Sequence, residues 1–345
     1  MRRPVTLLLL LLFVAAELYG LRVLPTPASG STWERLVASP AVVVTVEGHP
    51  FLLGAQDLWE LRRGSDGQWT ALARPLTWID VPEPSGAGFW RVAETPDGRP
   101  LASAGAPVFP APHGSWVLWV DGGTRALYVS QGRTVVLQRV TPVVAVETVR
   151  WNPTGTEALV AATGPEGRGV YRWAPGTGLV WTGPAAAAPV ASLDTGTPGS
   201  VVAVQVDGTV LAPGTGMNGV RLDAAWVGPG GAVLGVRSGK LVRWTGERWA
   251  TIPVPGLPTA PPRFEAGTGR AAYVTRTGGR SVLVVLDGTH AATVDCPGSD
   301  AVVAGWVGSA PVVAVLDGPN AGTYRMRTAT HGAGGGVATL PVGSL

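Results

Sequence analysis

The chain has 345 residues, enough for two domains, and its formal net charge of +3 comes from scattered Arg residues and one Lys, which argues against a nucleic-acid-binding stripe. Cys296 is the only cysteine, which excludes an intrachain disulfide and a cysteine-ligated zinc site. Gly (49) and Pro (31) are abundant, yet 46% of residues are hydrophobic and Val-rich runs recur between the turns, so we predict a packed all-β protein.

The N-terminus carries a predicted targeting segment over residues 1–24. Two arginines, Arg2 and Arg3, precede an apolar run from Val5 to Ala16, which is the pattern of a secretory signal and predicts a hydrophobic helix. A cleaved signal peptide and an uncleaved signal anchor are both compatible with it, and the two arginines favour the anchor. Residues 25–37 follow as a linker, and either alternative places the bulk of the chain outside the cytoplasm.

Short strands are predicted next, over residues 38–111. The runs 41–46, 58–62, 69–73 and 88–93 are apolar or alternate between apolar and polar residues, and the last one ends at an Asp-Gly turn. In their order, Trp59-Glu-Leu-Arg62 and Phe89-Trp-Arg-Val92 resemble strands of a fibronectin type III domain. The resemblance implies a small β-sandwich that acts as a spacer or binding module.

The region from residue 112 to 345 contains internal repeats. Six hairpins share a bulky apolar anchor, a run of small turn residues and a second apolar strand, and their anchors lie 32 to 42 residues apart. The anchors are Trp119, Trp151, Leu193, Trp226, Phe264 and Trp306. Small twisted sheets bury both faces when they pack radially around an axis, so we predict a six-bladed β-propeller, with five or seven blades as alternatives.

One hairpin carries a further resemblance. Trp151-Asn-Pro-Thr-Gly155 resembles the aromatic-Ser-Pro-Asp-Gly turn of WD-repeat-like bacterial propellers. This resemblance implies an architecture and no activity. In a propeller we expect Trp151 to fill the space between neighbouring blades.

Candidate binding residues lie just ahead of the anchors, where inner strands begin near one mouth of the channel. They are His113, Glu147, Asp223 and Asp300. Such a ring could hold a cation or a basic peptide, and its alternative interpretation is a set of solvated loop residues. The sequence predicts no catalytic residue, no metal-ligating His pair and no cofactor. Cys296 is better explained as a small filler residue than as a nucleophile.

These features favour a non-catalytic scaffold outside the cytoplasm that binds a protein or a cell-envelope component. It would be linked to the membrane by its N-terminal segment or secreted after cleavage. The alternative is an extracytoplasmic hydrolase or lyase with its site at the channel mouth, because a fold alone does not decide activity.

Overall fold

The computed structural model describes residues 32–327, apart from 38–40, 47–48, 55–57, 64–68, 85, 87, 96–97, 105, 132–136, 142–144 and 196–199. The predicted signal segment, residues 1–24, lies outside the described residues. Within them the regular structure is β-strand, with one 3-10 turn, η1 (Pro229–Gly231). No helix in these ranges is long and apolar enough to cross a membrane.

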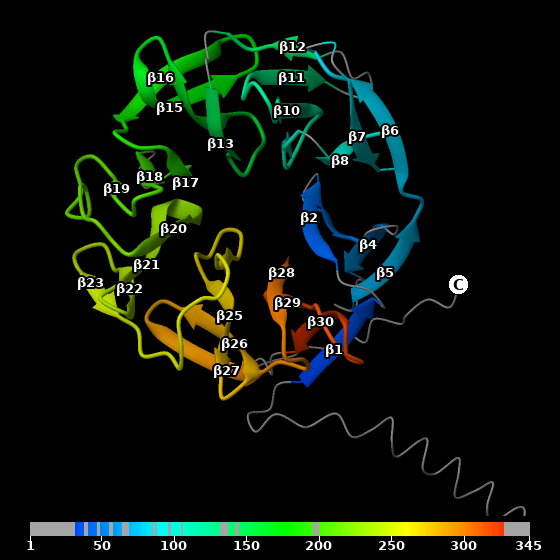
Figure 1. The fold of residues 1–345 in the computed structure, drawn as a ribbon, viewed down its shortest axis with the longest axis vertical. Coiled ribbons are helices and arrows are strands. Elements are labelled where there is room, and N and C mark those ends of the chain that lie inside the picture. Colours follow the sequence, from blue (N-terminus) through cyan, green and yellow to red (C-terminus); the bar gives the residue numbers. More distant parts are fainter. Residues whose placement is uncertain are drawn as a thin grey trace, which may run out of the picture.

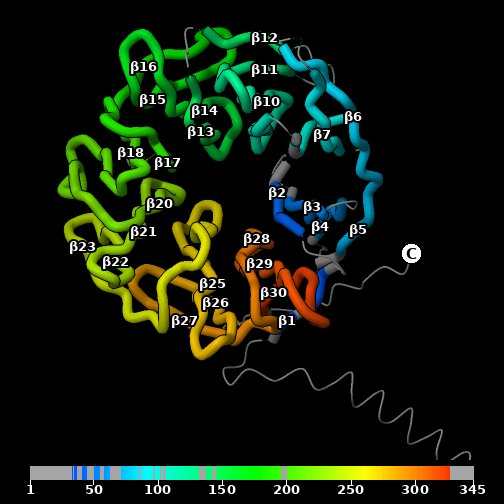
Figure 2. The backbone as a smooth tube through the Cα atoms, in the orientation of Figure 1, coloured from blue at the N-terminus to red at the C-terminus, as the bar shows by residue number. Residues whose placement is uncertain are grey.

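The described strands form eight antiparallel sheets arranged around a central axis as the blades of a propeller (Figures 1 and 2). The propeller is confirmed, but the predicted six blades, and the alternatives of five or seven, are wrong. The error has one cause. Residues 38–111, predicted as a separate sandwich, instead contribute two further sheets to the ring and the first strand of a third.

Six sheets begin with their inner strand and follow the chain outward. Their strands are β2 (Val42–Val46), β3 (His49–Leu53), β4 (Leu58–Arg63), β5 (Trp69–Arg74); β9 (Val108–Pro110), β10 (Trp116–Val120), β11 (Leu127–Gln131), β12 (Gln138–Arg139); β13 (Ala145–Trp151), β14 (Ala158–Gly164), β15 (Gly167–Ala174), β16 (Gly178–Ala185); β17 (Val190–Thr195), β18 (Val201–Gln205), β19 (Val210–Leu211); β20 (Ala224–Gly228), β21 (Ala232–Arg237), β22 (Lys240–Trp244), β23 (Trp249–Thr251); and β24 (Arg263–Phe264), β25 (Ala271–Thr277), β26 (Arg280–Asp287), β27 (His290–Asp295).

One sheet runs the other way. It consists of β6 (Thr77–Pro82), β7 (Phe89–Glu94) and β8 (Pro100–Ala104), and Figure 1 places β6 on the outer rim of the ring. The chain therefore passes from the outer strand β5 directly to the outer strand β6 and travels inward. It then continues from β8 into β9, the inner strand of the next sheet.

The ring is closed by the two ends of the described chain. The last sheet contains β28 (Ala301–Val307), β29 (Ala310–Val315) and β30 (Gly322–Arg327), and its outer strand is β1 (Thr32–Val37), at the end of the predicted linker. In the antiparallel register Thr32 lies opposite Arg327. The indole Nε1 of Trp33 donates to the carbonyl oxygen of Asp295 at 2.9 Å, which ties β1 to the preceding sheet as well.

No fibronectin-type sandwich is present in the described residues. Trp90 of β7 stacks on Trp119 of β10, with 6.1 Å between ring centroids, and both side chains are buried. The predicted strands themselves were largely right, since β2, β4, β5 and β7 match them. Antiparallel strands with one apolar face look alike in a sandwich and in a blade, because the local pattern does not show what that face packs against.

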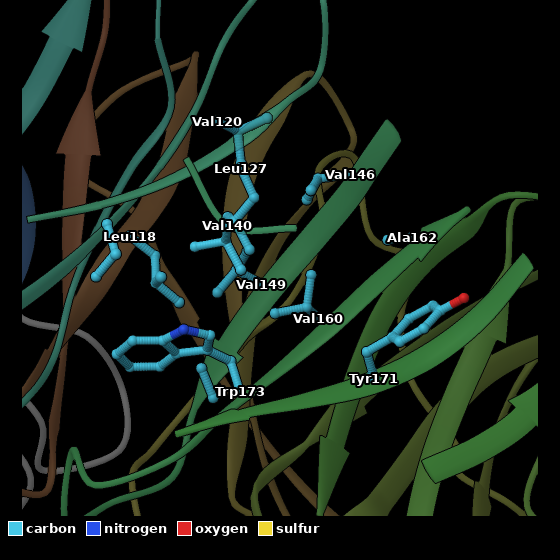
Figure 3. Close-up of a cluster of buried hydrophobic side chains, with 12 residues drawn as sticks. Leu118, Val120, Leu127, Val140, Val146, Val149, Val160, Ala162, Tyr171 and Trp173 are labelled. Atoms are coloured by element: carbon cyan, nitrogen blue, oxygen red, sulfur yellow. The ribbon is translucent and has the colours of Figure 1, made fainter. Parts of the chain in front are cut away.

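The core lies between neighbouring sheets rather than at the axis. Figure 3 shows one such layer, in which β10 and β11 supply Leu118 and Leu127, and β13 to β15 supply Val149, Val160 and Trp173. Trp151 packs edge-on against Trp173 of its own sheet, with centroids 5.6 Å apart, and belongs to the same layer as Phe109 and Trp116 of the preceding sheet. Its expected position between blades is therefore confirmed.

Candidate functional site

The ring has two different faces. Figure 1 shows β13, β20 and β28 on the side of their sheets that is nearest the axis. We call the face where the inner strands begin the start face and the face where they end the end face. Because the strands of each outward-running sheet alternate in direction, the turn between the second and third strand also lies on the start face.

Three of the four predicted residues share the start face. Glu147 lies near the beginning of β13, while Asp223 and Asp300 directly precede β20 and β28. His113 lies instead in the turn that follows β9. There it meets the turn at the end of β13, where a Cβ on Gly155 (φ +70°) would come within 2.4 Å of the His113 carbonyl oxygen. His113 is therefore on the end face, and the four residues form no ring.

Glu147 is occupied by contacts between blades. Its Oε1 lies 2.8 Å from Arg168 Nε in an ion pair, although that N–H does not point at the oxygen as a hydrogen bond would require. Its Oε2 accepts a hydrogen bond at 2.6 Å from the backbone N–H of Val190, the first residue of β17. The carboxylate therefore joins the sheet of β13 to the next sheet.

Asp300 is occupied as well. Arg276 Nη2 donates to its Oδ1 at 2.6 Å, and its backbone N–H donates to Asp317 Oδ1 at 2.8 Å. Hydrogen bonds from the Ser299 hydroxyl and from that backbone N–H hold the pKa of Asp317 below its usual value. Both carboxylates thus stabilise turns of the start face, and an added cation would have to compete with Arg276.

Asp223 remains exposed, and the structure shows no side-chain partner for it within the described ranges. Its backbone N–H donates to the Val236 carbonyl at 2.8 Å, which places it beside the β21–β22 turn. On its other side, Leu222 N–H donates to the Gly208 carbonyl at 3.0 Å. The backbones of Gly208 and Leu222 lie so close that a Cβ on Gly208 (φ +83°) would be 1.9 Å from the Leu222 carbonyl oxygen. A side chain at position 208 would therefore force these two backbone segments apart.

Three further exposed residues flank Asp223. Val206, in the β18–β19 turn, is 64% exposed, and Arg237 lies directly opposite Lys240 across the β21–β22 turn. Like charges at opposed positions repel, and no ion pair of the described residues involves either of them. We call Val206, Asp223, Arg237 and Lys240 the open start surface. Sequence reasoning missed it, although the Arg-Ser-Gly-Lys turn was the available signal.

Turns of the end face are linked from blade to blade. Trp151 Nε1 donates to the Phe109 carbonyl at 2.8 Å, and Trp306 Nε1 donates to the Arg263 carbonyl at 2.9 Å. Each indole thereby binds the inner strand of the preceding sheet. Arg243 reaches the other way and donates to the Gly269 carbonyl of the following sheet at 2.8 Å.

Burial shifts the pKa of two titratable groups, Cys296 and Asp194. Burial raises the pKa of the Cys296 thiol to about 12, so it is not a ready nucleophile. Asp194 of β17 lies 3.0 Å from Arg150 of β13, yet burial outweighs this pair and raises its pKa. Among the described residues no group of three His, Cys, Asp or Glu side chains could hold a metal ion.

The raised pKa of Asp194 predicts a pH-dependent stability. The folded protein binds this proton more tightly than the unfolded chain, so the contribution of Asp194 to the free energy of unfolding falls as pH rises from 3.8 toward the raised pKa. Asp194→Asn cannot titrate and should therefore gain stability relative to the parent over that window. Urea unfolding at a series of pH values measures this difference, and a constant difference would contradict the prediction.

Comparisons with known proteins assign no family to the chain. No protein-family model matches the chain, and a search of curated proteins finds no match. Among solved structures, the WD40 domain of Pan2 from Neurospora crassa is similar at 14% identity, covering 88% of this chain and 97% of that one, with a TM-score of 0.46. A catalytically inactive virginiamycin B lyase from Staphylococcus aureus has 12% identity, coverage of 86% and 99%, and a TM-score of 0.44. TolB from Acinetobacter baumannii has 17% identity, coverage of 82% and 68%, and a TM-score of 0.35.

Proposed function

We propose that the protein is a non-catalytic scaffold that holds a protein partner on the start face of its ring. The observation that carries this proposal is the open start surface. Indole and guanidinium groups of the end face, and Glu147 and Asp300 of the start face, bind neighbouring blades. The open start surface leaves two cations, one carboxylate and one apolar side chain exposed on the same face, where they can contact a partner.

The charge of this surface indicates which partner fits. A basic peptide is disfavoured, because Glu147 and Asp300 are already paired with Arg168 and Arg276. Arg237 and Lys240 together outweigh Asp223. A partner that brings carboxylates to these two cations and an apolar side chain to Val206 would match the surface.

The enzymatic alternative has less support. A hydrolase or lyase at the channel mouth needs at least two free polar groups that converge. Of the predicted residues, Glu147 and Asp300 hold the ring together and His113 lies on the other face.

The proposal also keeps the protein outside the cytoplasm, linked to the membrane by residues 1–24 or secreted. Protease accessibility of the folded ring in intact cells tests that location, since protection until the cells are lysed would contradict it.

Site-specific photocrosslinking in the producing cell tests the binding function. A photoreactive side chain at Val206 samples the start face, and the same group at Glu247, in the β22–β23 turn, samples the end face one sheet away. Both positions are exposed. We expect one reproducible crosslinked protein from position 206 and none from position 247.

A charge-reversed control completes the experiment. With Arg237→Glu and Lys240→Glu added, the crosslink from position 206 should be lost while the protein remains folded. Equal crosslinking from both faces, or no product from position 206, would overturn the proposal.

A further inference from the structure

A second unusual surface lies on the rim, on the sheet of β6, β7 and β8. One face of this sheet is buried, where Val81, Trp90 and Val92 pack against the sheet of β9 to β12. Side chains alternate along a strand, so the intervening residues point to the opposite face. On that face Phe89 is 68% exposed and Trp78 is 40% exposed, and Asp80 and Arg91 between them are exposed too. We call Trp78, Asp80, Phe89 and Arg91 the rim face.

The described residues of the neighbouring blade leave the rim face exposed. Between the sheets of β2–β5 and β6–β8, Leu58 of β4 and Leu101 of β8 are buried in one cluster. Farther out, Leu72 of β5 is 43% exposed. Glu60, on the same sheet, is held by Arg62 at 2.6 Å and by Arg74 at 2.7 Å rather than by any residue of β6 or β7. Among the described residues, Leu72 on β5 and Trp78 and Phe89 on the facing sheet are therefore left exposed.

The two charges of the rim face form no ion pair among the described residues. Asp80 and Arg91 are directly opposed in the β6–β7 register, where an ion pair would be expected. The Arg91 guanidinium lies instead over the Trp78 ring, 5.5 Å from its centroid. Within the described residues Asp80 has no cationic partner and Arg91 has no carboxylate partner. One acid, one base and two aromatic rings are thus exposed together on two adjacent strands.

The edge of β6 is poorly suited to adding a further strand. Pro82 lies in the strand, and Pro75 and Pro84 lie just outside it. Proline has no N–H to donate, and prolines on an edge strand oppose ladder formation. An occupant of this region would therefore dock on the face of the sheet rather than extend it.

We propose that the rim face is the docking surface for a second copy of this chain, related by a two-fold axis. An isologous interface requires that a residue i on one copy meet j on the other while j meets i. The rim face has this property, because a two-fold rotation can bring Asp80 of each copy to Arg91 of the other. The same rotation brings each Phe89 to Pro82 of the other copy, because these two residues are also opposed in the β6–β7 register. Figure 1 places β6, the strand that carries Trp78 and Asp80, on the outer rim of the ring.

Charge reversal combined with mixing gives a decisive test by sedimentation velocity. The full-length protein should show concentration-dependent dimerisation. Asp80→Arg and Arg91→Asp should each weaken self-association at least about tenfold, because each places like charges together. An equimolar mixture of the two variants should dimerise again, since one copy then presents two cations and the other two carboxylates. The double variant should also dimerise alone.

The controls separate this contact from general effects of charge or folding. Arg280→Asp and Asp295→Arg reverse an equally exposed pair on other strands, 79% and 66% exposed, and should leave dimerisation unchanged. Phe89→Ala should weaken it without lowering the thermal midpoint of the monomer. Three results would overturn the proposal: a monomer at every concentration, dimerisation insensitive to the single reversals, or reversals that are not rescued by mixing. A monomer whose rim face crosslinks to another protein would assign the surface to that partner instead.

Discussion

Replacing Trp119 by alanine is expected to lower the free energy of unfolding by about 3–5 kcal/mol, the usual cost of removing a buried aromatic side chain. Trp119 is fully buried, stacks on Trp90 and donates its indole N–H to the Ser130 hydroxyl at 2.9 Å. Urea unfolding followed by circular dichroism measures the loss. Trp119→Phe keeps most of the ring contact and leaves the buried Ser130 hydroxyl without its donor, so it should cost less, about 1–3 kcal/mol.

The same substitution tests whether residues 38–111 belong to the ring. Trp90 lies in a segment whose sequence resembles a separate domain, yet it packs on the ring residue Trp119. Trp90→Ala and Trp119→Ala should therefore destabilise the same unfolding transition, and their effects should be non-additive because the rings touch. Two separate transitions, each moved by only one of the substitutions, would support the sandwich after all.

Leu36→Asp is expected to open the ring. Leu36 of the closing strand β1 is 2% exposed and packs with Leu52, Leu61 and Ala314 between the last and first sheets. Leu36→Ala should cost about 2–5 kcal/mol, and an unpaired carboxylate at this position should cost more, enough to detach β1. Limited proteolysis should then cut within residues 32–37 while the remaining sheets resist.

The matched control is Val180→Asp. Val180 also lies in an outer strand, β16, but is 52% exposed, so its substitution should change stability by less than about 0.5 kcal/mol. Equal losses at positions 36 and 180 would show that the closing strand has no special role.

The hairpins were predictable because their signal is local. Five predicted anchors, beginning with Trp151, end or lie within the inner strand of a blade, and a second strand of the same sheet follows each of them. The sixth, Trp119, lies in β10, which is the second strand of its sheet. The short strand β9 was missed because three residues give no periodic pattern. That error also explains His113, which was placed before an inner strand but in fact follows one.

The candidate site was predictable only in part, for a related reason. The position of Glu147, Asp223 and Asp300 on one face follows from chain order alone. Whether each carboxylate is free depends on Arg168 and Arg276, which lie on other strands at distances that spacing does not fix. The outer strand β1 was likewise unpredictable, since its partner β30 is almost 300 residues away. No local pattern specifies such a contact.

The closure of the ring by β1 has a consequence for the order in which the molecule can be built. Thr32 is among the first described residues to leave the ribosome, and its partner Arg327 is the last. Seven sheets can form from neighbouring segments as the chain lengthens, but the eighth must wait until β30 has been synthesised. Contacts of such high sequence separation make folding slow, because the entropy of closing the loop is lost before the contact is gained. The ring can therefore be completed only after β30, the last strand of the ring, has been synthesised.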